Sequence, residues 1–428
     1  MSEPTCLIAT MCYCLVMTHR KRAGRWTFKR IVQDRDNWER YKRVFDGQVT
    51  AHQVAEVEKM LGCRELKNGF ATYICLDCGE MVQVPFSCKS RVCSSCGKVH
   101  AEEWAEQLAS RMFNVTHRHI TLTVPDRLWP EFEGEVGLRG VLFQAAGATL
   151  KKVMRVEPGI AVVLHPYGKD LKVNYHAHVL VTEGGMDEDG RWRDRPYINY
   201  EALRKVWQYE VLTRLREVMP KDNRAKRLID RMFREYPKGF YVYAKPRVRD
   251  GQGVSRYIGR YIRHPAIADA RIVGYDGEKV TFFYEEHSGQ RREVVMPVLE
   301  FIHGVVRHIP PKQFKMIRYY GLYAPRKSSK VKALMERIGK AVGRVVRRLS
   351  WRKRIERDFR RDPLTCPRCG SHDMELYSIT FRSQGQLKTI GGIKSLLESG
   401  AIIPLEPGEP DTHPTSTPVP PLQLALSL

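Results

Sequence analysis

Two closely spaced pairs of cysteines constrain the fold of this chain more than any other feature. Six cysteines fall between residues 63 and 96, and four of them form two Cys-x-x-Cys pairs. In a zinc ribbon each such pair turns tightly, so that two thiolates face one ion. Gly79 and Gly97 follow the pairs, where such a turn needs a positive φ. The spacing therefore predicts a small N-terminal zinc-ribbon-like module with one structural Zn²⁺ held by Cys75, Cys78, Cys93 and Cys96.

Other cysteines extend this prediction. A third pair, Cys366-Pro-Arg-Cys369, precedes Gly370 near the C-terminus. The apolar start, Cys6–Met17, lacks the basic region and the cleavage site of a secretory signal, and Met17 is an alternative start. The 11 cysteines are therefore expected to be metal ligands or free thiols rather than disulfides. Further zinc-ligand candidates are Cys63, Cys88, Cys366 and Cys369, with His52 and His100 as weaker ones.

The net charge points to a polyanionic partner. The 428 residues carry 72 Lys and Arg against 48 Asp and Glu, a formal net charge of +24. Nucleic acid is the commonest partner of such a protein. No run of 18 apolar residues is present, so no membrane-spanning helix is expected. We therefore expect a DNA partner, no membrane, and a cytoplasmic, nucleoid-associated localisation of the prokaryotic type.

Half of that net charge lies in one segment. Residues 326–361 hold 15 Lys or Arg and 3 acids, so 15 minus 3 gives +12. Apolar residues recur there at helical spacing from Val331 to Leu349, which indicates a basic amphipathic helix. A solvated charged face is the alternative interpretation. The DNA-binding candidates in this segment are Arg347, Arg348, Arg352, Lys353 and Arg354.

The middle of the chain predicts an α+β fold, an antiparallel sheet with helices on one face. Period-two alternation indicates strands at 117–125, 159–165 and 175–182, and the last two form a hairpin around a turn at 166–170. Asp276-Gly277 marks a second hairpin. Helices are expected at 200–236 and 297–307, and a further strand at 239–245.

The hairpin strand carries two histidines, in the run Tyr175–Val181. Side chains alternate along a strand, so His176 and His178 face one way and the apolar residues between and after them face the other. Two imidazoles so placed can hold one Mg²⁺ or Mn²⁺, and Mn²⁺ tolerates imidazole better. The third ligand stays open between His264, His165, Glu183 and a glutamine. A second His-x-His, His117-Arg-His119, has a charged middle residue, and its histidines are expected to contact phosphate or to pack.

A helix is expected downstream, and it would carry Tyr257 and Tyr261, four residues apart, on one face. A tyrosine has a pKa near 10, so its attack on a phosphate needs a metal-polarised substrate or nearby cations. Attack would give a 5′-phosphotyrosine and a free 3′-hydroxyl. Packing of both rings on the sheet is the alternative interpretation. The cations expected to assist the attack and bind DNA are Arg256, Arg260 and Arg263.

In order along the chain, these motifs resemble the rolling-circle transposases of the insertion sequence 91 family, which combine a two-tyrosine, His-hydrophobe-His nuclease with an N-terminal zinc-binding domain. The resemblance spans roughly residues 35–380. It implies metal binding by His176 and His178, tyrosine nucleophiles at Tyr257 and Tyr261, and the nicking and joining of single-stranded element ends. The matching segments are Cys75–Cys96 including Cys88 and Arg91, Ile120–Pro125, His176–Gly185, Tyr257–Tyr261 with Ala266, Ile267, Arg271 and Ile272, Arg318–Leu322 and Asp362–Gly370.

The motifs and the resemblance together predict five segments of the chain and leave three candidate functions. We expect an N-terminal arm at 1–45, a zinc-binding domain at 46–108, a catalytic domain at 109–325, a basic helix with a zinc knuckle at 326–380, and a disordered tail at 381–428. The apolar extension before Met17 and the proline-rich tail beyond 400 depart from the family pattern. The alternatives to a transposase are a replication initiator or relaxase with the same chemistry, and a non-catalytic zinc-dependent nucleic-acid-binding protein.

Overall fold

The structure is a computed structural model, and it divides the chain into two compact units that are described separately. The large unit comprises Arg25–Glu58 and Lys89–Val346, and the small unit comprises Lys59–Cys88 and Arg347–Leu428 together with the N-terminus. The residues that the structure describes are 26–109, 112–134, 136–244, 266–286, 289–325, 331, 333, 335–336, 350–359, 362–392, 403–404 and 424–425.

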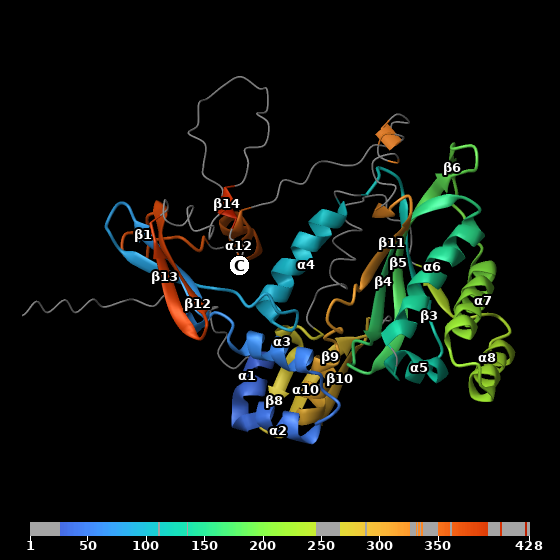
Figure 1. The fold of residues 1–428 in the computed structure, drawn as a ribbon, viewed down its shortest axis with the longest axis horizontal. Helices are drawn as coiled ribbons and strands as arrows, with labels where there is room; N and C mark the ends of the chain where they lie inside the picture. Colours follow the sequence, from blue (N-terminus) through green and yellow to red (C-terminus); the bar gives the residue numbers. More distant parts are fainter. Residues whose placement is uncertain are drawn as a thin grey trace, which may run out of the picture. The chain divides into compact units, whose positions relative to one another are not determined.

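A six-stranded antiparallel sheet forms the centre of the large unit (Figure 1), and it confirms the expected fold class. Its strand order is β11-β4-β5-β3-β7, with β6 paired to the end of β5. The predicted hairpin is present, because β4 and β5 pair antiparallel along most of their length. The strands are β3 (His117–Thr123), β4 (Glu157–Tyr167), β5 (Val173–Met186), β6 (Trp192–Asp194), β7 (Val242–Ala244) and β11 (Ile317–Gly321).

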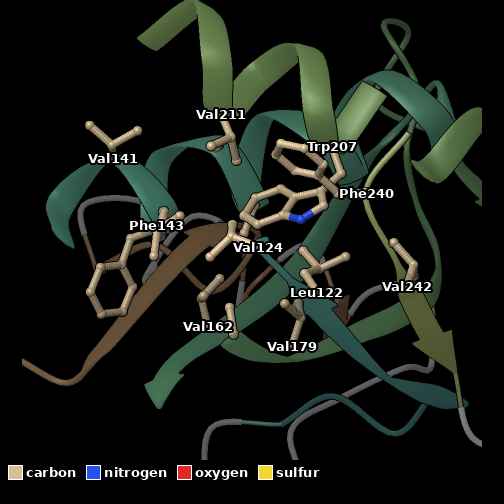
Figure 2. Close-up of a cluster of buried hydrophobic side chains, with 14 of the residues drawn as sticks. Leu122, Val124, Val141, Phe143, Val162, Val179, Trp207, Val211, Phe240 and Val242 are labelled. Carbon is tan, nitrogen blue, oxygen red and sulfur yellow. The ribbon is translucent and has the colours of Figure 1, made fainter. Parts of the chain in front are cut away.

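Helices cover one face of this sheet. The core between them contains Trp207, which is fully buried and whose Nε1 donates a hydrogen bond of 2.7 Å to the carbonyl of Thr123. Figure 2 shows the indole lying among Leu122, Phe240 and other apolar side chains of strands and helices. The helices of this face are α5 (Trp129–Gly134), α6 (Arg139–Met154), α7 (Tyr200–Val218) and α8 (Asn223–Glu235).

The alternation of β5 separates the helix-covered face of the sheet from the opposite face. Ala177 and Val179 belong to the core beneath the helices. Leu180 packs on the opposite face, with Leu108 of α4 (Ser94–Ala109) and Ala161 of β4. The even-numbered positions of β5 therefore point away from α6 and α7, as predicted for His176 and His178.

The segment 200–236, which was predicted to be helical, forms two helices, α7 and α8. Pro220 cannot continue a helix, and α7 ends at Val218. Asp222 then caps α8, since its carboxylate accepts a hydrogen bond of 2.7 Å from the amide of Ala225.

A second sheet in the large unit packs against the N-terminal helices. Gly277 has φ +104° in the turn between its first two strands, as the Asp-Gly signal predicts. The Tyr275 hydroxyl donates to the carboxylate of Asp34 at 2.8 Å, which ties the N-terminal segment to this sheet. The elements are α1 (Phe28–Gln33), α2 (Asn37–Val44), α3 (Ala51–Leu61), β8 (Ile272–Tyr275), β9 (Lys279–Glu285), β10 (Arg291–Pro297) and α10 (Val298–Val306), and the 3₁₀ turns of the chain are η1 (Asp34–Asp36), η2 (Leu66–Asn68), η3 (Asp126–Leu128), η4 (Val136–Leu138) and η5 (Asp269–Arg271).

The small unit joins two parts of the chain that are far apart in sequence. Its sheet has the order β13-β12-β1-β2, so that β1 near the N-terminus pairs antiparallel with β12 near the C-terminus. Residues 386–391, which were expected to be disordered, form β13. The elements are β1 (Gly69–Cys75), β2 (Met81–Pro85), α12 (Trp351–Phe359), β12 (Met374–Ser383), β13 (Gln386–Gly391), β14 (Ile403–Pro404) and β15 (Leu424–Ala425).

Among the described helices, none combines the length and the apolar character needed to cross a membrane.

Candidate metal centre and cysteine clusters

Three histidines meet on the sheet face that points away from α6 and α7. His176 and His178 lie on β5, and His165 lies on β4 directly opposite His176 in the strand register. One nitrogen from each imidazole lies within 4.8 Å of the others. Of the candidates for a third ligand, His165 therefore joins the predicted pair. His264 lies outside the described residues.

Glu183, another of the third-ligand candidates, has a different partner in the structure. Its carboxylate accepts a hydrogen bond of 2.7 Å from Nε of Arg118, and a second one from Nη2 of the same guanidinium. Arg118 also donates to the hydroxyl of Tyr200. This buried ion pair lies at the far end of β5, and Glu183 is not a member of the histidine group.

Hydrogen bonds fix the orientation of both β5 histidines. Nδ1 of His176 lies 2.7 Å from the carbonyl of Asn174, which accepts its proton. Nδ1 of His178 lies 2.9 Å from Nε2 of His119 and 3.2 Å from Oγ1 of Thr121. Partners of this kind orient metal-ligating histidines in other proteins and set their tautomer. In this arrangement Nδ1 of His176 and of His178 is engaged within the protein, and Nε2 is the nitrogen of each that could hold a metal.

The histidines of the second His-x-His motif differ from each other in role. His117 is fully buried, and its Nε2 is 2.7 Å from the hydroxyl of Tyr323. Burial lowers the pKa of His117 to about 4, so it is a neutral packing group rather than a phosphate contact. His119 orients His178, a role that the sequence analysis missed. Strand alternation could have revealed this role. β3 pairs with β5 so that Thr121 lies opposite His178, and His119, two residues from Thr121, points to the same face.

The structure corrects the grouping of the cysteines. The thiols of Cys75 and Cys78 lie with those of Cys366 and Cys369, not with those of Cys93 and Cys96. Cys93 and Cys96 belong to the large unit, whereas Cys75, Cys78, Cys366 and Cys369 all belong to the small unit. The four sulfur atoms of the small-unit group lie within 4.8 Å of one another, and the eight cysteines in the described part of the chain are free of disulfides. Four thiols at this separation suit a structural Zn²⁺.

Local backbone geometry explains why the predicted grouping of Cys75 and Cys78 with Cys93 and Cys96 is wrong. Gly79 has φ +73°, as a knuckle requires, but Gly97 does not adopt a positive φ. Cys96 and Gly97 lie in the first turn of α4, where backbone angles are helical. The second turn of the predicted kind is found at Gly370, which has φ +75°.

Of the predicted DNA-binding residues, Arg352 has a partner within the protein. Its guanidinium donates to both carboxylate oxygens of Asp362, at 2.9 and 2.6 Å, and to the carbonyl of His372. Partial burial alone would raise the pKa of Asp362, but hydrogen bonds from Arg352, Leu364 and His372 lower it to about 2. Lys353 is exposed and Arg354 is half-buried. The predicted residues outside the described part of the chain are Arg256, Tyr257, Arg260, Tyr261, Arg263, Arg347 and Arg348.

Comparisons with known proteins agree on one family. Residues 33–124 match the family "Transposase zinc-binding domain" of insertion sequence 91 elements, and residues 159–331 match the family "Putative transposase". The "Transposase for insertion sequence element IS801" of Pseudomonas savastanoi pv. phaseolicola is 31% identical over 296 residues, 64% of this chain and 71% of that protein. The "Putative transposase y4qJ" of Sinorhizobium fredii is 26% identical over 372 residues, 79% of this chain and 93% of that protein.

No solved structure matches this chain. The zinc-binding match and the small-unit cysteine group together support structural Zn²⁺. The family matches lie in the same order as the motifs found in the sequence, and they overlap both the cysteine-rich segment and the histidine strand. The chain belongs to the insertion sequence 91 family of transposases.

Proposed function

We propose that this transposase nicks and joins single DNA strands by metal-assisted tyrosine attack, as in rolling-circle transposition. One observation supports the proposal most directly. His165, His176 and His178 lie together on one face of the central sheet of a transposase. A divalent cation held by them would neutralise charge that develops on the oxygens of the scissile phosphate. An all-imidazole donor set suits Mn²⁺ better than Mg²⁺.

Tyr257 and Tyr261 are the proposed nucleophiles. In the attack a bond forms between the phenolic oxygen and phosphorus, and the bond between phosphorus and the 3′ oxygen breaks. The phenolic proton leaves the tyrosine, and the departing 3′ oxygen takes up a proton. The phosphodiester energy is kept in the 5′-phosphotyrosine, so that the reverse attack by a 3′-hydroxyl joins strands without an external energy source. The second tyrosine accepts another strand while the first is occupied.

Single-stranded element ends are the proposed substrate. The net charge of +24 supports a nucleic-acid partner. Arg256, Arg260 and Arg263 flank the tyrosines in sequence and would stabilise the charge on the attacked phosphate. A replication initiator or relaxase with the same chemistry is the alternative, and family membership favours the transposase.

A nicking assay on single-stranded oligonucleotides carrying the element ends tests the metal centre. His176→Ala and His178→Ala should each abolish cleavage and leave DNA binding nearly intact, because they remove ligands and not phosphate contacts. A chelator should abolish cleavage by the native chain as well. Added Mn²⁺ or Mg²⁺ should then restore cleavage by the native chain but not by the variants. His52→Ala, in α3, is the matched histidine control and should cleave normally. Full nicking by the His176→Ala, His178→Ala double variant would reject the proposal.

A further inference from the structure

Two Cys-x-x-Cys-Gly turns in the small unit have the same backbone geometry, although about 290 residues separate them. The amide of Gly79 donates to the carbonyl of Cys75 at 2.9 Å, and the amide of Gly370 donates to the carbonyl of Cys366 at 3.0 Å. Both glycines have a positive φ, +73° and +75°. The amides of Cys75 and Cys366 also donate forward, at 2.8 and 2.7 Å, to residues just beyond each turn. The structure thus contains two Cys-x-x-Cys-Gly turns of the same kind.

The four sulfur atoms of these knuckles have the spacing of one tetrahedral site. Sγ of Cys75 lies 3.6 Å from Sγ of Cys369, and Sγ of Cys78 lies 3.6 Å from Sγ of Cys366. Four sulfurs placed about 2.3 Å from a central Zn²⁺ lie about 3.8 Å from one another. A disulfide would instead bring two sulfurs to about 2.05 Å. The donor set and its spacing therefore fit a structural zinc.

Strand pairing brings the two knuckles together. β1 runs antiparallel to β12, with Gly69 opposite Phe381 and Cys75 opposite Met374. Just beyond β1, the amide of Leu76 donates to the carbonyl of Asp373 at 3.0 Å. The same end of the sheet holds a small apolar cluster that contains Cys75, Val82, Leu364, Cys366 and Met374. Each knuckle thus adjoins a strand, β1 or β12, and the two strands pair with each other.

The C-terminal knuckle is also braced by α12. Arg352 of α12 bonds both oxygens of Asp362 and the carbonyl of His372, and Asp362 in turn accepts from the amide of Leu364 at 3.0 Å. These bonds flank the knuckle on both sides in sequence. Hydrogen bonds therefore join α12 to the segment that carries the C-terminal knuckle.

We propose that Cys75, Cys78, Cys366 and Cys369 bind one zinc ion that closes a discontinuous zinc module. The C-terminal knuckle lies beyond both matched family regions, which end at residues 124 and 331. It completes the metal site of the N-terminal domain, and residues 89–346 of the large unit lie between the two halves of this module in the sequence. The proposal concerns the assembly of the fold and does not depend on the tyrosine chemistry.

Zinc counting by native mass spectrometry on the full chain tests this site. Cys366→Ser/Cys369→Ser and Cys75→Ser/Cys78→Ser should each lose one zinc equivalent relative to the native chain. The quadruple variant should also lose one equivalent, because both pairs serve the same ion. Cys6→Ser/Cys12→Ser is the matched control and should keep the native count. A native count in Cys366→Ser/Cys369→Ser, or the loss of two equivalents in the quadruple variant, would overturn the proposal.

Thiol alkylation of the native chain gives a test that needs no variant to fold. Cys369 is exposed, yet it should resist alkylation as long as zinc is held. On chelation all four cysteines should become reactive in a single phase, as mapped by peptide mass spectrometry. The site would be refuted if Cys366 and Cys369 reacted at the rate of free thiols while Cys75 and Cys78 stayed protected.

Discussion

His119 contacts His178, one of the proposed metal ligands. Its Nε2 lies 2.9 Å from Nδ1 of His178, and the two rings stack with centroids 5.0 Å apart. Loss of such a partner typically weakens metal affinity about 10–100-fold. We therefore expect His119→Ala to weaken Mn²⁺ binding by about that factor, measured by titration with electron paramagnetic resonance. His119→Gln, which retains a hydrogen-bonding amide, should restore part of the affinity. Unchanged affinity in His119→Ala would contradict the positioning role.

His117 makes stability depend on pH. Its pKa is near 6.5 in the unfolded chain and about 4 in the folded one, because burial disfavours the imidazolium. Between these values the unfolded chain binds more protons, so the free energy of unfolding falls as pH drops from about 6.5 to 4. The full difference corresponds to about 3 kcal/mol at most.

His117→Gln keeps a group that can bond the Tyr323 hydroxyl but removes the titration. The free energy of unfolding, from denaturant titration, should decline less steeply between pH 6.5 and 4 in this variant than in the native chain. His308, whose pKa burial also lowers to about 4, should preserve part of the slope. Identical pH profiles would show that His117 does not contribute.

At the scale of elements, substitution of Trp207 tests how much the packing of α7 against the sheet contributes to stability. Its indole is fully buried in the main core and bonds the end of β3. Trp207→Ala should lower the free energy of unfolding by about 3–5 kcal/mol, the usual cost of emptying such a site. Tyr209→Ala, on the exposed side of the same helix, should cost less than about 1 kcal/mol. Equal losses in the two variants would contradict the assignment of this core.

The elements that local pattern controls could be predicted from the sequence. Period two predicts the β4–β5 hairpin and the facing of His176 and His178, since a one-residue slip would move every side chain to the other face. The Asp-Gly turn before β9 is equally local. The end of α7 is local too, because Pro220 and the Asp222 cap mark the break within the helical segment 200–236.

Contacts between distant segments could not be predicted in the same way. Cys-x-x-Cys spacing fixes which two thiols share a turn, but not which turns share an ion. The pairing of Cys75 with Cys369 depends on β1 meeting β12, a contact that spans nearly 300 residues. His165 was one of several possible third ligands until the β4–β5 register placed it opposite His176.

At the scale of the whole molecule, the basic segment 326–361 should supply affinity that is independent of sequence. Deleting it should reduce the dependence of DNA binding on salt, because each lost phosphate contact removes the release of about one counterion. An unchanged salt slope would mean that this charge faces solvent.

Variants of two neighbouring residues of α12 can distinguish a DNA-contacting role from a structural one. Lys353 is exposed, so Lys353→Ala should reduce the salt slope by about 1 and leave stability nearly unchanged. Arg352 bonds Asp362 and His372, so Arg352→Ala should instead destabilise the small unit. Binding isotherms at several salt concentrations and thermal unfolding distinguish the two. The reverse pattern would contradict the structural role of Arg352.

The proposed mechanism requires that a tyrosine of this transposase becomes covalently linked to DNA. Single-stranded element ends incubated with the protein and Mn²⁺ should yield an adduct that survives denaturation, and mass spectrometry should place the nucleotide on Tyr257 or Tyr261. Tyr257→Phe/Tyr261→Phe should fold, bind metal and form no adduct, whereas Tyr197→Phe, at a highly exposed tyrosine, should form it normally. An adduct in the double variant, or DNA attached to any other residue, would contradict the mechanism.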